Sequence, residues 1–327
     1  MLMLAGHASA ELVWTPQSGW KLEGGALAGV NSSDAQSAIG LMNKARTAEE
    51  KGSNRSALKN YGKVAKKYPN SIYASEAQYR LGKLRLAQKQ YAKAFEAFQI
   101  VATRYPNTPR FDEIIGQQYH IATALLDGAR GRVWGIFPGF MNREKALEYL
   151  EILLIEAPYS DYAPLALMSI ASGHQFFKNS EEAIDSLDRM INTYSTSALT
   201  PEAYLKLAQA HSALVEGPYY DQASTRDSIT YYEDFMILFP SDNNVVSAEK
   251  GLTNMKRMLA DSKVKIGDFY FHKRSNYKAA RVFYNEAITV YPDSDIAAKA
   301  RDYLVEVDAA AAKSAQSQPT KKRFFFF

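Results

Sequence analysis

The stretch SEAQYRLGKLRLAQKQYAKAFEAFQIVATRYP, residues Ser75–Pro106, decides the fold of this chain. Apolar residues recur at helical spacing in two segments, one on each side of a tight turn at Gln88–Gln90. Pro106 ends the second segment, because proline lacks a backbone N–H and clashes with the preceding helical turn. Gly82 and Ala94 leave room for two helix backbones to approach closely. The stretch therefore predicts a pair of packed amphipathic helices.

The same pattern recurs along the chain, so that six units share one register. In each second helix, a small residue and two apolar residues precede a terminal residue at constant offsets, and this terminal residue is proline in every unit except the fourth. Such a unit cannot bury its apolar face alone and must stack on copies of itself. The aligned positions are Ala57, Tyr61, Val64 and Pro69; Ala94, Phe98, Val101 and Pro106; Ala146, Leu150, Leu153 and Pro158; Ala183, Leu187, Met190 and Ser195; Ser228, Tyr232, Phe235 and Pro240; and Ala280, Tyr284, Ala287 and Pro292.

This pattern is similar to the tetratricopeptide repeat family. It predicts an all-α fold, a right-handed α-solenoid of about six helical hairpins with a C-terminal capping helix near residues 297–307. We divide the repeats into an N-terminal half, residues 34–200, and a C-terminal half with its cap, residues 201–308. Residues 309–327 are rich in Ala, Ser, Gln and Lys, a composition that predicts a disordered tail.

Composition and motifs point away from an enzyme. The 327 residues carry a net charge of only +4 with mixed signs, whereas nucleic-acid-binding proteins concentrate positive charge on one face. The chain has no cysteine, which excludes disulfides and cysteine metal sites. Phosphate-binding, zinc-protease and nucleophile-elbow motifs are missing, and the five histidines are spread along the sequence. We therefore expect no catalytic residue, no metal and no cofactor.

The first 33 residues differ from the repeats. MLMLAGHASA, residues 1–10, resembles the end of an apolar signal core followed by a small-x-small cleavage site, and we expect the remnant of a signal peptide there. An ordinary frayed terminus is the alternative. Residues 11–33 contain Trp14 and Trp20 among proline and glycines, so we expect an extended arm that docks both tryptophans on the first repeat.

The third unit contains an insertion, GARGRVWGIFPGFMN, at residues 128–142. Several large apolar side chains in a loop need a surface that covers them. We favour the interpretation that they fold back on their own repeats. The alternative is a partner-docking site, for which Trp134, Phe137 and Phe140 are the candidates.

The first helices of a repeat array line a concave surface that suits an extended peptide. Near the N-terminal end this lining mixes cations with tyrosines, which favours a peptide with aromatic side chains and an acidic group. An inner face that binds only water is the alternative. The candidate peptide-binding residues are Arg46, Tyr79, Lys83, Tyr119 and Thr123.

The C-terminal part, Ser228–Ser294, resembles the end of the BamD family, the periplasmic tetratricopeptide subunits of the outer-membrane β-barrel assembly machinery. Weaker similarity extends back to about residue 36. The resemblance rests on an ordered set of short segments around one long helix. These segments are Phe239–Ser241, Met255–Arg257, Ile266–Tyr270, Asn276–Ala280 and Tyr291–Ser294.

This resemblance implies a scaffold at the inner face of the outer membrane. Its C-terminal repeats would dock on a BamA-like barrel subunit, and its N-terminal repeats would face unfolded outer-membrane proteins. We take Phe269, Tyr277 and Arg281 as the partner-docking candidates. Two features depart from the family, because the chain has no cysteine for a lipid anchor and Phe283 stands where members often carry arginine. The alternative is an adaptor for cell-envelope division or peptidoglycan machinery of the Tol–Pal-associated type.

Overall fold

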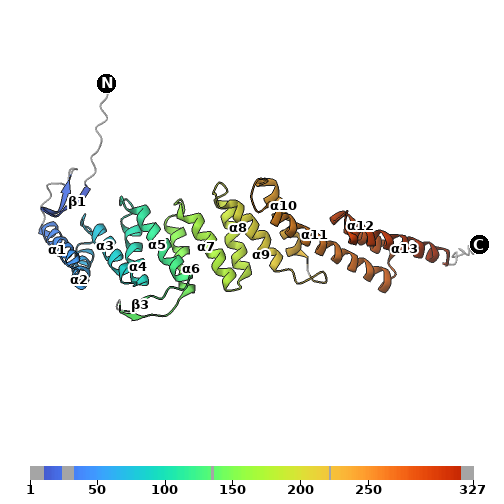
Figure 1. Ribbon diagram of the computed structural model, residues 1–327, viewed down its shortest axis with the longest axis horizontal. Helices are drawn as coiled ribbons and strands as arrows, with labels where there is room; N and C mark the ends of the chain where they lie inside the picture. Colours follow the sequence, from blue (N-terminus) through green and yellow to red (C-terminus); the bar gives the residue numbers. More distant parts are fainter. Residues whose placement is uncertain (1–10, 24–32, 134–135, 221, 318–327) are drawn as a thin grey trace, which may run out of the picture. The chain divides into compact units, whose positions relative to one another are not determined.

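The computed structural model describes residues 11–23, 33–133, 136–220 and 222–317. These residues form thirteen α-helices and two short β-hairpins, in two compact units that divide between Gly173 and His174 (Figure 1). The division of the repeats at residue 200 stays a prediction. The side chains of Leu126 and Leu147 pack against Gly173, so the first part of its helix packs with the preceding repeats.

Helices alternate along the chain as the first and second members of the predicted pairs, which confirms the all-α repeat fold. The first members are α1 (Ser33–Glu50), α3 (Ala74–Ala87), α5 (Phe111–Leu126), α7 (Tyr162–Phe176), α9 (Thr200–Ala213) and α11 (Val245–Asp268). The second members are α2 (Asn54–Lys67), α4 (Tyr91–Arg104), α6 (Arg143–Glu156), α8 (Ser180–Thr193), α10 (Ala223–Leu238) and α12 (Tyr277–Val290).

The repeat positions named from the sequence form the core. Every small and apolar second-helix position of the six units is buried, and the most exposed of them, Tyr232, has only 5% of its surface accessible. Each second helix ends two residues before the predicted terminal residue. Since side chains at these spacings lie on one face of a helix, the six second helices all bury the same face.

The turns inside the hairpins share an unusual backbone geometry. The residue two positions before the second helix has a positive φ in four units: Gly52 (70°), Lys89 (55°), Lys178 (61°) and Ser275 (50°). Glycine tolerates this left-handed conformation without strain, whereas residues with a Cβ pay a steric cost. Three of the four turns therefore hold a side chain in a disfavoured conformation.

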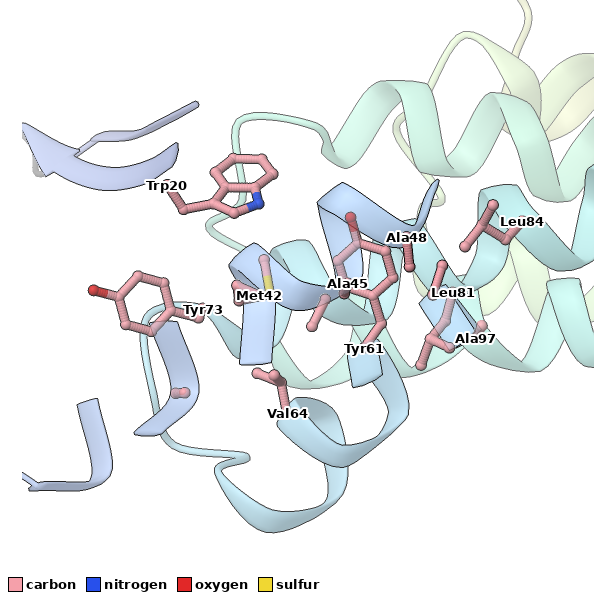
Figure 2. Close-up of a cluster of buried hydrophobic side chains, with 13 residues drawn as sticks. Trp20, Met42, Ala45, Ala48, Tyr61, Val64, Tyr73, Leu81, Leu84 and Ala97 are labelled. Carbon is pink, nitrogen blue, oxygen red and sulfur yellow. The ribbon is translucent and has the colours of Figure 1, made fainter. Parts of the chain in front are cut away.

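The N-terminal arm is an antiparallel hairpin of β1 (Glu11–Thr15) and β2 (Gly19–Glu23) rather than a single extended segment. Its two tryptophans dock on the first repeat as predicted. Trp20 is 3% exposed and points toward Met42 of α1 (Figure 2). The backbone N–H of Trp20 donates to Asn43 Oδ1 over 2.8 Å, and the guanidinium of Arg46 lies 4.4 Å from the Trp14 ring centroid.

The C-terminal unit ends in a longer cap than predicted. After α11, Phe269–Lys273 form a π-helical turn, and α13 (Asp295–Ser317) then packs along α12. Ala297, Ala300 and Val307 of α13 are buried, which places the cap where the sequence predicted it. However, α13 continues through residues 309–317, which composition assigned to a disordered tail. Four consecutive alanines, the strongest helix formers, account for the difference.

The predicted signal remnant, residues 1–10, and the last residues, 318–327, lie outside the described part of the chain. Among the helices that the structure describes, none combines the length and the apolar character that crossing a membrane requires.

Candidate functional site

A network of alternating charges joins α1, α3 and α5 in the first unit. Its centre is Arg80, whose guanidinium lies 2.7 Å from Glu76 and 3.7 Å from Glu49. Glutamates and cations then alternate in both directions from Arg80. The remaining pairs are Arg46 with Glu49 (3.5 Å) and Glu50 (3.2 Å), Arg110 with Glu76 (3.1 Å) and Glu113 (3.5 Å), and Lys83 with Glu113 (3.4 Å).

Two tyrosine hydroxyls add hydrogen bonds to the glutamates of this network. The Tyr61 hydroxyl donates to Glu49 over 2.8 Å, and the Tyr79 hydroxyl donates to Glu113 over 2.5 Å. Burial, followed by the hydrogen bond to Glu113, raises the pKa of Tyr79 well above its ordinary value. Burial opposes ionisation of Glu113, but the hydrogen bond from Tyr79 and the neighbouring Lys83 and Arg110 lower its pKa overall. At neutral pH, Tyr79 is therefore neutral and Glu113 is ionised.

The predicted peptide-binding residues are divided between this network and a separate aromatic contact. Arg46, Tyr79 and Lys83 belong to the network, where carboxylates of the same chain already pair with them. The Tyr119 hydroxyl shares a 3.3 Å hydrogen bond with Ser169, and the Thr123 hydroxyl donates to the backbone of its own helix. An acidic ligand at these cations would have to replace internal partners. The peptide-binding role of these five residues stays a prediction.

The insertion folds as a second hairpin, β3 (Arg132–Val133) and β4 (Phe137–Pro138), which runs back toward the turn between α3 and α4 (Figure 1). Its backbone makes the attachment. The Arg132 N–H donates to the Lys89 carbonyl over 2.8 Å, whereas the Gly139 N–H donates to the Gly131 carbonyl within the insertion itself over 2.8 Å.

The apolar side chains of this hairpin are exposed. The accessible fractions are 73% for Ile136, 56% for Phe137, 94% for Phe140 and 48% for Met141. Our favoured interpretation, that they fold back on the repeats, is therefore wrong for these four. The physical reason is that the hairpin meets the turn between α3 and α4 through the backbone hydrogen bond from Arg132 to Lys89, which does not require these side chains to be buried. Trp134 lies outside the described residues.

A cavity of about 300 Å³ lies beside the hairpin, and sequence analysis did not identify it. Tyrosine and phenylalanine rings and three cations line it, without a carboxylate. Its residues come from three places in the chain, and in the sequence each looks like an ordinary repeat or turn residue. The lining side chains are Gln90, Tyr91, Ala92, Lys93, Leu125, Arg132, Phe140, Asn142, Lys145 and Tyr149.

The C-terminal docking candidates lie around the junction of α11 and α12. Phe269 opens the π-helical turn and is 46% exposed, with the Arg274 guanidinium 5.4 Å from its ring centroid. Tyr277 is half-buried and packs against Phe271. Arg281 forms an ion pair with Asp308 of α13 at 2.5 Å. Arg281 also borders a cavity of about 550 Å³ between α11 and α12.

Phe283, which stands at the position of the expected family arginine, has a structural role in this unit. Its ring stacks on Tyr270 at 5.4 Å between centroids and 4° between planes, and Lys263 lies 5.7 Å from its centroid. The aromatic pair holds the start of the π-helical turn against α12. In the described parts of both units, no cluster of three or more His, Asp or Glu side chains is placed to hold a metal ion.

Comparison with known proteins adds a family assignment. A family profile described as YfiO, outer membrane lipoprotein, matches residues 141–323, more than half of the chain. Tetratricopeptide repeat profiles match residues 40–71 and 76–108. No curated protein matches the chain.

Several solved structures are similar to this chain at low sequence identity. A tetratricopeptide repeat protein from Parabacteroides merdae is 15% identical, with a TM-score of 0.33, over 84% of this chain and 99% of that chain. The C-terminal part of one from Cytophaga hutchinsonii is 16% identical, with a TM-score of 0.34, over 80% and 86%. The Rap conjugation gene regulator of plasmid pLS20, solved with the Phr* peptide, is 12% identical, with a TM-score of 0.34, over 90% and 80%.

Proposed function

The chain belongs to the YfiO outer membrane lipoprotein family, and on this premise we propose that it is a periplasmic scaffold of the outer-membrane β-barrel assembly machinery. Tetratricopeptide repeats provide surfaces for protein–protein interaction, which supports the role of a scaffold. In this proposal the chain binds a BamA-like barrel subunit and unfolded outer-membrane proteins at the inner face of the outer membrane.

The observation that carries this proposal is the extent of the family match. Residues 141–323 include the long α11, the π-helical turn, α12 and the cap. This region presents Phe269 as an exposed aromatic side chain with Arg274 over its ring. Exposed aromatic and arginine side chains are enriched among the residues that dominate protein interfaces. We place the barrel-subunit contact at this turn, together with Tyr277 and Arg281.

Affinity purification from intact envelopes tests the proposal. The tagged full chain should recover a BamA-like barrel subunit, and Phe269→Ala should reduce that recovery about tenfold, the loss expected for a moderate interface anchor. Val305→Ala is the matched control, because Val305 is 71% exposed in the same unit but belongs to α13, outside the turn. Recovery of no barrel subunit would overturn the proposal. Enrichment at the division septum without a barrel subunit would favour the adaptor for division machinery instead.

A further inference from the structure

The β3–β4 hairpin of the first unit projects apolar side chains outward. Ile136 and Phe140, at 73% and 94% exposed, are among the most accessible large apolar residues that the structure describes. Phe137 and Met141 add two more half-exposed side chains within the same six residues. Single exposed apolar residues are ordinary on soluble proteins, but a cluster of this size marks a contact surface.

Unpaired positive charge surrounds this cluster. Lys89, Lys93, Arg130 and Arg132 are all exposed, and none has an ion-pair partner among the residues that the structure describes. From Gly128 to Lys145 the sequence holds four cations but only one carboxylate, Glu144. The surface around the hairpin is therefore basic, although the chain as a whole is nearly neutral.

We propose that this hairpin binds the surface of a lipid bilayer that contains anionic phospholipids. Apolar and aromatic side chains on a protruding element enter the interfacial layer of a membrane, where aromatic rings are favoured. Lysines and arginines beside them are attracted by the negative surface potential of anionic lipids. Protruding apolar residues with a basic rim match both requirements. The proposal concerns the first unit only and does not depend on the barrel partner proposed for the second.

The charges that line the cavity beside the hairpin also match an anionic lipid. Lys93 and Arg132, which have no ion-pair partner among the described residues, line it together with Lys145, which pairs with Glu148, and no carboxylate lines it. The proposal places one anionic phosphate headgroup there. A peptide-binding surface would instead hold its apolar groups in a concave pocket, whereas Phe140 is almost fully accessible. A second copy of the chain would bring the same positive charge to this surface, so charge repulsion would oppose self-association there.

Co-sedimentation of the full chain with vesicles tests the proposal. The chain should sediment with vesicles of phosphatidylethanolamine and phosphatidylglycerol and remain in solution with vesicles of phosphatidylcholine alone. Raising the salt from about 0.1 M to about 1 M, which shortens the Debye length from about 10 Å to about 3 Å, should weaken sedimentation. Ile136→Ser/Phe140→Ser should reduce the vesicle partition coefficient at least about tenfold.

Two variants complete the experiment. Arg130→Gln/Arg132→Gln removes two cations while keeping the backbone hydrogen bond of residue 132, and should reduce partition by roughly fivefold or more. Ile155→Ser/Tyr159→Ser is the matched control, because these residues are 79% and 98% exposed in the same unit but outside the hairpin, and partition should not change. Equal partition of the wild type and the hairpin variants overturns the proposal. Failure of the wild type to sediment with anionic vesicles also overturns the proposal, and this includes the case in which the hairpin binds a protein instead.

Discussion

The ring of Phe98 in α4 lies directly on the backbone of Gly82 in α3. A Cβ at position 82 would stand 2.6 Å from Phe98 Cε1, closer than any real carbon contact. The last hairpin repeats the arrangement, where a Cβ at Gly267 would stand 2.6 Å from Tyr284. The glycine thus allows a large ring to fill the space between two helices, and the ring is fully buried in both hairpins.

Gly82→Ala should destabilise the protein by about 1–3 kcal/mol, because the added methyl overpacks a closed contact with an aromatic ring. Urea denaturation followed by circular dichroism measures the change. Gly62→Ala in α2 is the matched control, since no atom lies within 4 Å of its Cβ position. It should stabilise the protein by about 0.5–1 kcal/mol through helix propensity. Equal effects of the two substitutions would contradict the packing argument.

Lys178→Gly should stabilise the protein by up to about 1 kcal/mol, because Lys178 holds a φ of 61° that glycine adopts without steric cost. Thermal unfolding measures this, with a higher melting temperature expected. Lys178→Ala separates the backbone effect from the loss of charge, since alanine keeps the strain and should leave the melting temperature nearly unchanged. The reverse change, Gly52→Ala in the first hairpin, should lower it.

Tyr79→Phe should destabilise the protein by about 1 kcal/mol at neutral pH, because it removes a hydrogen bond to the ionised Glu113. The pKa of Glu113 is lower in the folded than in the unfolded chain, so the unfolded state binds more protons in acid. The stabilisation is therefore present above the unfolded pKa of about 4.3 and is lost as the pH falls through the folded value. Melting temperatures of the two proteins should converge below about pH 4. A constant difference from pH 3 to pH 7 would contradict this.

The repeat fold was predictable because each unit carries its own complete signal. A small residue such as Ala94, a large one such as Phe98 and a terminal proline appear within one helix, and local spacing alone determines which face is buried. The docking of Trp20 was predictable for a similar reason, since a tryptophan in a short arm needs a surface to cover it. The pairing of β1 with β2 was not, because it depends on the turn at Gly19, with φ 69°.

The charged network was not predictable from the sequence. Arg80 and Glu49 are 31 positions apart, and Arg110 and Glu76 are 34 apart, so their pairing depends on how successive first helices stack. Arg46, Tyr79 and Lys83 were recognised as members of one surface, but not as groups already paired within the chain. The exposure of Phe140 was missed for a different reason, because composition does not tell whether a loop attaches by its side chains or by its backbone.

Arg80→Leu should destabilise the protein by about 2 kcal/mol, far more than Lys145→Ala. The Arg80 side chain is only 22% exposed and joins Glu49 to Glu76, and Glu76 is only 11% exposed. Removing one member of a buried charged group leaves a carboxylate short of its partner, which is costly, and Arg110 compensates for Glu76 in part.

The ion pair of Lys145 with Glu148 provides the matched comparison, because both side chains are largely exposed to solvent. Its loss should change the free energy of unfolding by less than about 0.5 kcal/mol. Urea denaturation at low and high salt distinguishes the two cases. The cost of Arg80→Leu should persist in high salt, since buried pairs are screened much less than surface pairs. A cost that disappears in about 1 M salt would mean that solvent reaches the network and that α1, α3 and α5 do not bury it.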